Sequence, residues 1–85
     1  MKSPEQIAVE KARELPAKER ALAVAQWDIV CEEYETRMLE LPLSKRPKSF
    51  EVHHLVTKAR AAFLEALVAG EPLEGCASAA RAILK

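Results

Sequence analysis

Apolar residues recur at spacings of three and four along most of the chain, and prolines interrupt this pattern at five positions. Such spacing places apolar side chains on one face of an α-helix. The longest stretch runs from about residue 16 to 41, and a second long stretch runs from about 50 to 69. Shorter stretches precede and follow them. The pattern therefore predicts an all-α fold of three to four helices.

The predicted helix ends carry local signals. "SPEQ" at residues 3–6 matches a capping box, in which the first and last of these residues hydrogen-bond each other's backbone. Pro16 disfavours helical geometry in the residue before it and predicts a break ahead of the long helix. Ser49 is expected to cap the third helix, and Gly70 is expected to end it.

The stretch at residues 42–49 contains two prolines, two serines and three cations, and it predicts an exposed loop. A short loop favours a long antiparallel helical hairpin, with the short helices flanking it and covering its open sides. The long helix would extend roughly 39 Å, which is more than a compact chain of this size covers. We therefore expect a homodimer. Its shared core is predicted to contain Leu22, Trp27, Ile29, Tyr34 and Phe63.

Length and composition support this interpretation. The 85 residues form one helical domain, residues 1–85, which buries only about three-fifths of its unfolded surface. The sequence has 15 alanines, and its two glycines are Gly70 and Gly75. This composition packs helices and gives strands little support.

Charge is balanced overall but unevenly distributed. The chain has 13 basic and 13 acidic residues, yet residues 28–44 carry five acidic residues against one arginine, and residues 45–60 carry five cations against one glutamate. Glu33 and Arg37, four residues apart, are expected to pair on the wet side of the long helix. Two interpretations stay open: the charged faces complement each other within the fold or across a dimer, or the basic stretch receives an acidic partner or phosphates.

Candidate chemistry is sparse. His53 and His54 are adjacent, so on a helix they point about 100° apart and do not grip one metal ion together. Glu51 shares a face with His54, but two ligands are too few for a structural zinc site. A pH-sensitive contact is the remaining role for these histidines. We expect no metal site, no cofactor and no enzyme activity, because the sequence lacks a nucleophile motif and a glycine-rich phosphate loop.

The expected compartment is the cytoplasm. Cys31 and Cys76 lack metal or redox spacing and are expected to be small buried side chains in a reducing environment. The N-terminal residues have no apolar core like that of a signal peptide, and no apolar run reaches about 18 residues. We expect no membrane association.

One segment resembles a known family. "KARELPAKERALAVAQW", residues 11–27, looks like the opening of the small antitoxins called addiction-module components, in which a helix, a Leu-Pro break and a Glu-Arg-rich helix start follow one another. The resemblance covers about a fifth of the chain, and the later residues have no counterpart of the toxin-binding tail. It implies a small regulator that binds a partner.

The sequence thus favours a non-enzymatic protein-binding module, a regulator or inhibitor acting through helical surface contacts. Its size also suits a phage or mobile-element origin. A nucleic-acid-binding regulator, antitoxin-like or transcriptional, that uses the basic residues within 45–60 is the alternative, and a purely structural assembly subunit is a third. The candidate partner-binding residues are Lys45, Arg46, Lys48, Lys58, Arg60, Glu32 and Glu35.

Overall fold

The computed structural model describes residues 2–84, with Glu5 described without its side chain. The chain forms four α-helices and one short 3-10 helix, and residues 2–84 contain no strand. The elements are α1 (Pro4–Arg13), α2 (Ala17–Glu40), η1 (Leu43–Lys45), α3 (Ser49–Val68) and α4 (Leu73–Ile83). The predicted all-α class is confirmed, and the predicted helix boundaries agree with the structure to within a few residues.

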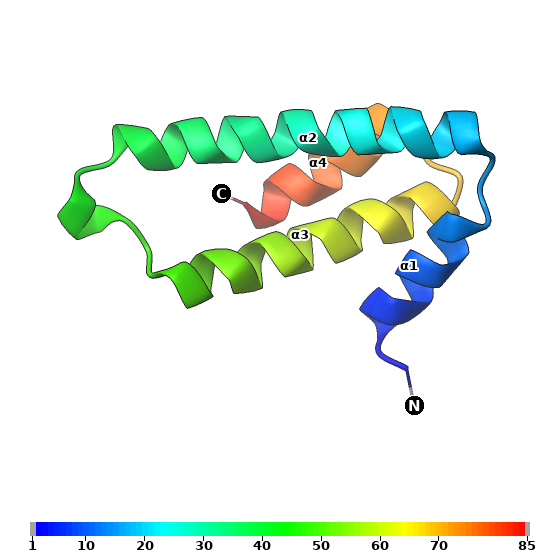
Figure 1. The fold of residues 1–85 in the computed structure, drawn as a ribbon, viewed down its shortest axis with the longest axis horizontal. Coiled ribbons are helices and arrows are strands. Elements are labelled where there is room, and N and C mark those ends of the chain that lie inside the picture. The colour runs from blue at the N-terminus through cyan, green and yellow to red at the C-terminus, as the bar shows by residue number, and fades with distance from the viewer. Residues whose placement is uncertain (1, 85) are drawn as a thin grey trace.

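The two long helices run in opposite directions and are joined at one end by the loop that contains η1 (Figure 1). At the other end, α1 crosses towards α3 and leads into α2. The molecule is flat and elongated, with extents of 42 × 29 × 18 Å. Its thin dimension leaves much of each long helix in contact with solvent.

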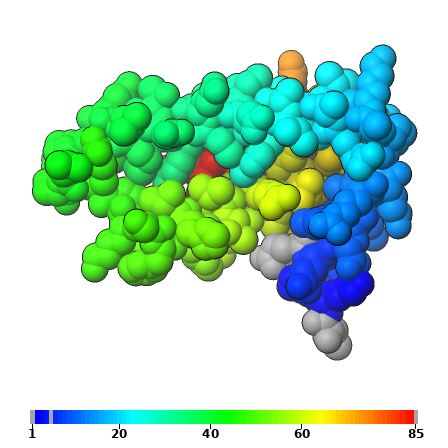
Figure 2. All heavy atoms as spheres, in the orientation of Figure 1, coloured from blue at the N-terminus to red at the C-terminus, as the bar shows by residue number. Residues whose placement is uncertain are grey.

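The last helix covers one open side of the hairpin formed by the two long ones. α4 packs most extensively on α3 and also on α2, whereas α2 and α3 touch each other little. In Figure 2, red atoms of the C-terminal end are visible between the green atoms of the two long helices. The sequence led us to expect that this helix covers an open side of the hairpin. The structure agrees: α4 lies behind α2 and α3 in the view of Figure 1, and its buried face consists of Cys76, Ala77 and Ala80, which let both helices approach closely.

The core combines these small residues with a few large ones. Phe63 and Val30 are almost completely buried, as is Leu84 at the end of α4. The rings of Trp27 and Phe63 meet edge to face, with centroids 5.8 Å apart and planes inclined by 62°. The remaining buried apolar residues of this cluster are Ala23, Tyr34, Ala59, Ala66, Cys76, Ala77 and Ala80.

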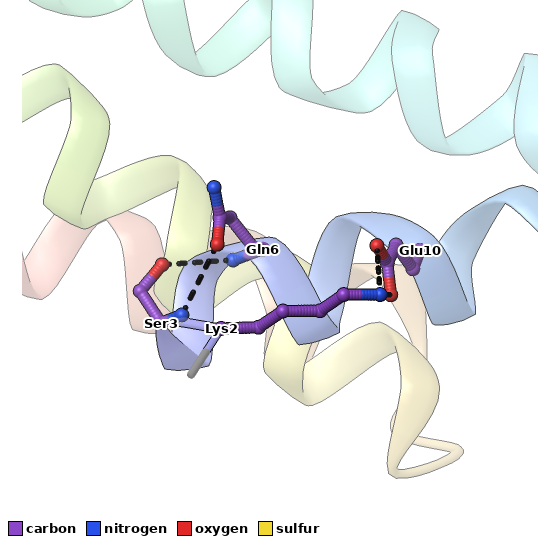
Figure 3. Close-up of polar contacts among 4 residues, drawn as sticks. All are labelled: Lys2, Ser3, Gln6 and Glu10. Carbon is purple, nitrogen blue, oxygen red and sulfur yellow. Dashed lines mark hydrogen bonds and ion pairs between the residues drawn. The ribbon is translucent and has the colours of Figure 1, made fainter.

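The start of α1 has the predicted capping box (Figure 3). The backbone N–H of Gln6 donates to Ser3 Oγ at 3.2 Å, and the backbone N–H of Ser3 donates to Gln6 Oε1 at 3.2 Å. Lys2 reaches along the helix to pair with the carboxylate of Glu10 at 2.7 Å. The capping box satisfies two backbone donors, the N–H groups of Ser3 and Gln6, that would otherwise lack a partner. It therefore fixes where the first helix begins.

The two ends of α3 differ in how well they were predicted. Gly70 ends the helix as expected: its φ is +87°, its N–H donates to Leu67 O, and the N–H of Glu71 donates to Ala66 O, the pattern of a Schellman motif. At the other end, Ser49 is the first helical residue and not the cap. Lys48 precedes the helix, and its N–H donates to the carboxylate of Glu51 at 3.2 Å.

Candidate protein-binding surfaces

Large apolar side chains remain in contact with solvent at eight positions of the described chain. They are Ile7, Leu22, Val24, Ile29, Leu39, Leu41, Leu43 and Phe50, with exposed fractions from 36% to 81%. Single exposed apolar residues are ordinary, but a concentration of them beside charged residues is typical of a contact surface. Half of the eight lie within residues 39–50, which we call the hairpin tip.

The hairpin tip is held by Arg46. Its Nε donates to Leu41 O at 2.9 Å, and its Nη2 donates to Leu39 O at 3.1 Å. These carbonyls lie at the C-terminal end of α2, where backbone acceptors lack helical partners and a cation is favoured. Leu43 and Phe50 project from the tip with 81% and 67% exposure. The arrangement presents apolar side chains on a loop whose backbone is fixed.

The five cations predicted as one binding set do not share one surface. Arg46 is occupied with the end of α2, while Lys45 and Lys48 are exposed at the hairpin tip. Lys58 and Arg60 lie two residues apart on α3, so they point to nearly opposite sides of the helix. Arg60 lines a groove near the end of the hairpin opposite its loop. Arginines of α1 and α2 line the same groove.

The acidic face of α2 is partly occupied by the fold itself. Glu33 accepts two hydrogen bonds from Arg81 of α4, at 2.9 and 3.0 Å. The hydrogen bond from Arg81 lowers the pKa of the Glu33 carboxyl, and the same contact raises the pKa of Arg81. The expected pairing of Glu33 with Arg37 is replaced by this one, because Arg37 donates to Leu84 O at 2.9 Å. The two acidic residues predicted to bind a partner, Glu32 and Glu35, are both exposed.

The residues predicted for a dimer core fall into two groups. Phe63 and Tyr34 are 2% and 7% exposed, so the single chain already buries them, and Trp27 is half-buried against the same core. Leu22 and Ile29 are 51% and 47% exposed. These two lie on an exposed side of α2, where Ile29 shares a hollow with Arg81 of α4, and they are the members of the predicted set that a second subunit could still cover.

That side of α2 carries a continuous stripe. Residues three and four apart on a helix are neighbours on its surface. Lys18, Leu22, Ala25, Ile29 and Glu32 follow this spacing, and all five are exposed. We call them the α2 outer stripe. It consists of a short apolar centre with a cation at one end and a carboxylate at the other.

Four of the hollows on the surface of residues 2–84 differ in chemistry. A groove between α1, α2 and α3 has a volume of about 210 Å³. It contains eight apolar residues and three arginines, and we call it the arginine groove. Its lining consists of Val9, Ala12, Arg13, Arg20, Ala23, Val24, Trp27, Arg60, Phe63, Leu64 and Leu67. The other three hollows contain at least one carboxylate each, from Glu51, from Glu35, and from Glu32 with Glu33.

The two histidines lie in the hollow beside the hairpin tip, with Phe50 and Glu51. Both are exposed and lie in the first turns of α3. Within residues 2–84, no group of three or more His, Cys, Asp or Glu side chains is arranged to hold a metal ion.

Both cysteines are free thiols in apolar surroundings. Cys76 is fully buried at the centre of α4, and Cys31 on α2 is half-buried. Burial raises the pKa of each thiol, and nearby carboxylates raise it further. Both thiols thus stay protonated at neutral pH, and a protonated thiol is a poor nucleophile.

Comparison with protein-family models, with curated proteins and with solved structures gives no match to this chain. The resemblance of residues 11–27 to addiction-module antitoxins therefore has no support from these comparisons; the segment spans the end of α1, the Pro16 break and the start of α2. Among the described residues, no helix is both long enough and apolar enough to cross a membrane.

Sequence reasoning did not identify the arginine groove. Arg13 and Arg20 lie on either side of the Pro16 break, and Arg60 lies in another helix. Only the packing of α1 on α3 brings the three together. One signal was present in the sequence, since Trp27 is the one tryptophan of the chain and falls between Ala23 and Val30 in the apolar stripe of the long helix.

Proposed function

We propose that this chain is a small, non-enzymatic protein-binding module that acts as a homodimer, in the manner of a regulator or inhibitor. The observation that best supports this proposal is the exposure of eight large apolar side chains in a domain whose core relies heavily on alanine. Covering such side chains contributes roughly 25 cal/mol for each Å² removed from water. The hairpin tip and the α2 outer stripe are the two surfaces where a partner would gain most.

The α2 outer stripe suits a second copy of the same chain. If two α2 helices cross antiparallel about a two-fold axis near Ala25, Leu22 of one copy lies opposite Ile29 of the other. The same register brings Lys18 opposite Glu32, at both ends of the contact. The stripe is therefore self-complementary in both its apolar and its charged positions, which a two-fold interface requires.

Light scattering coupled to size exclusion tests the dimer, because one chain has a mass of 9.4 kDa. The wild type is expected at twice that mass. Lys18→Glu or Glu32→Lys alone places like charges opposite each other at two symmetric points, and each should raise the dimer Kd roughly tenfold. The double variant Lys18→Glu/Glu32→Lys restores opposite charges and should restore the dimer.

Glu35→Lys is the matched control. It makes the same charge change on α2 but lies off the α2 outer stripe, so the dimer should be unaffected. A wild type that stays at 9.4 kDa at every concentration would remove the dimer from the proposal. If Glu35→Lys weakens association as much as Glu32→Lys, the dimer uses another register.

The hairpin tip is the proposed contact for a different protein. Leu43→Asp/Phe50→Asp places two charges among its apolar side chains without touching the core, since both residues are mostly exposed. Tagged wild-type and variant chains are expressed in the source cells and purified, and the proteins bound to each are compared. One protein should co-purify with the wild type and be absent from the tip variant. Glu65→Gln, which changes an exposed side chain of α3 outside the hairpin tip, should retain it. Identical sets of bound proteins from all three chains would argue against the hairpin tip.

The nucleic-acid alternative has less support. A regulator that grips phosphates needs its cations on one surface, and Lys58 and Arg60 diverge while Arg46 holds the hairpin tip. We place the proposed module in the cytoplasm, because it carries two free cysteines and because a reducing compartment keeps such thiols unpaired.

A further inference from the structure

We propose that the arginine groove binds one apolar side chain of an acidic, amphipathic segment from a partner protein. This inference rests on the proposed function of the chain as a protein-binding module and adds the chemistry of what it binds. In Figure 2, yellow atoms of α3 are visible between the cyan atoms of α2 and the blue atoms of α1. The arginine groove lies between these three helices.

The lining of the groove favours an apolar group. Leu64 and Leu67 of α3 and Val24 of α2 contribute aliphatic surface, and the edge-to-face pair of Trp27 and Phe63 contributes aromatic surface. Val24 is 59% exposed. An entering apolar side chain would remove water from this surface and from its own, which is the main favourable term in most protein association.

The volume of the groove limits the size of that group. Pockets for small-molecule ligands usually measure about 300–1,000 Å³, whereas this groove measures about 210 Å³. A cavity of about 150 Å³ holds a molecule the size of benzene. The groove therefore accommodates a single large side chain, such as that of leucine or phenylalanine, better than a whole metabolite.

The charge around the groove selects the segment that carries this side chain. Arg13, Arg20 and Arg60 line it and no carboxylate does, which distinguishes it from the other three hollows. Among the side chains described for residues 2–84, no carboxylate forms an ion pair with any of the three. Arginine presents a planar set of donors that matches a carboxylate. An apolar side chain flanked by glutamate or aspartate satisfies both features.

The three arginines come from three different helices. Arg13 ends α1, Arg20 lies in the first turns of α2, and Arg60 is on α3. An acidic segment that contacts all three would connect α1 to α2 and α3. Because the groove lies near the end of the molecule opposite the hairpin tip, this partner segment would not contact the tip.

Trp27 provides the measurement, because it is the one tryptophan of the chain and it lines the groove. Two synthetic peptides of about 15 residues serve as probes, long enough for marginal helicity. Both have leucines along one helical face. All charged positions are glutamate in the first and lysine in the second. The glutamate peptide should shift Trp27 emission to the blue and bind more weakly as salt is raised, and the lysine peptide should not bind.

Arginine variants connect this binding to the groove. Arg13→Gln/Arg20→Gln/Arg60→Gln should raise the Kd for the glutamate peptide about tenfold, and replacing all three with lysine should recover part of the loss. Lys45→Gln/Lys48→Gln/Lys58→Gln is the matched control, since it removes three exposed cations elsewhere and should leave the Kd within about twofold. Circular dichroism confirms that each variant keeps the helical fold.

Several results would overturn the inference. Equal binding of the two peptides would mean that the groove does not select acidic partners, and an equal loss in the control variant would mean that overall charge is responsible. A wild type whose Trp27 emission changes on dilution together with its mass, with the arginine variant monomeric, would mean that a second copy fills the groove.

The failure of this inference is distinguishable from the failure of the proposed function. A chain that ignores both peptides but forms the dimer and loses a bound protein with the tip variant has only the groove assigned wrongly. A chain that ignores both peptides, stays monomeric and shows no loss with the tip variant fails both proposals.

Discussion

Arg81 on α4 donates two parallel hydrogen bonds to the carboxylate of Glu33 on α2, from Nε at 2.9 Å and from Nη2 at 3.0 Å. One helical turn further along α2, Arg37 donates to the carbonyl of Leu84, which follows α4. Both contacts join the last helix to the long helix from the same side. The packing of small residues at their interface is therefore accompanied by directional polar contacts at its edge.

The ion pair predicts a pH dependence of stability. Because the pKa of Glu33 is lower in the folded chain, its stabilising contribution is complete above the ordinary glutamate pKa of about 4.3 and disappears as the pH falls through the lowered value. Glu33→Gln should therefore lower the melting temperature slightly at neutral pH, and this effect should disappear as the pH falls through the lowered pKa of Glu33. Melting curves across this range check it. Glu35→Gln removes an exposed carboxyl of the same helix that forms no ion pair with the described residues, and it should leave the melting temperature at neutral pH unchanged.

The two phenylalanines are expected to lose very different amounts of stability on the same substitution. Phe63 is 2% exposed and Phe50 is 67% exposed. Phe63→Ala should cost about 3–5 kcal/mol of unfolding free energy, and Phe50→Ala should stay within about 0.5 kcal/mol. Urea unfolding followed by circular dichroism measures both. If Phe63→Ala does not fold, Phe63→Leu provides a milder loss, and equal effects of the two alanine variants would contradict the assigned core.

Replacing each of the two glycines with alanine is expected to change the stability of the fold in opposite directions. At Gly70, φ is +87°, a conformation that costs a residue with a Cβ about 1–2 kcal/mol, so Gly70→Ala should lower stability. At Gly75, inside α4, an added Cβ would meet Pro72 Cγ at 3.7 Å, an ordinary contact. Gly75→Ala should therefore raise stability by roughly 0.5–1 kcal/mol. Thermal unfolding of the pair checks the prediction, and the same sign for both would be inconsistent with this account of α4.

The cysteines predict an order of modification. Cys76 is fully buried between helices, whereas Cys31 is half-buried on the face of α2. Iodoacetamide at neutral pH should label Cys31 slowly, because its raised pKa keeps the thiol protonated, and should label Cys76 only after unfolding in urea. Mass spectrometry of peptides from a time course separates the two. Faster labelling of Cys76 in the native chain would mean that α4 detaches from the core.

Local signals accounted for most of the fold. The capping box at Ser3, the break at Pro16 and the glycine at position 70 each act within one helical turn, so adjacent residues suffice to predict them. Ser49 is the exception. A serine is a better cap than a lysine in general, but here the carboxylate of Glu51 accepts a hydrogen bond from the N–H of Lys48. Lys48 is therefore the cap, and α3 begins at Ser49, one residue earlier than predicted.

Contacts between distant residues were not predictable in the same way. Glu33 pairs with a residue 48 positions away in place of Arg37 in the next turn of α2. Helical periodicity identifies the buried face of α4 but not which helices it touches. The arginine groove depends on three residues whose proximity follows from how α1 packs. Leu22 and Ile29 were rightly identified as apolar positions of α2, and their role between two subunits stays a prediction.

The position of α4 also affects how the chain reaches its fold during synthesis. α2 and α3 emerge from the ribosome before α4, yet they touch each other little without it. The hairpin therefore has no completed core until residues 73–83 are available, and its apolar inner faces stay wet until then. A ribosome that pauses before these residues holds a hairpin whose apolar inner faces are exposed, and the core is completed only when residues 73–83 can pack on both long helices.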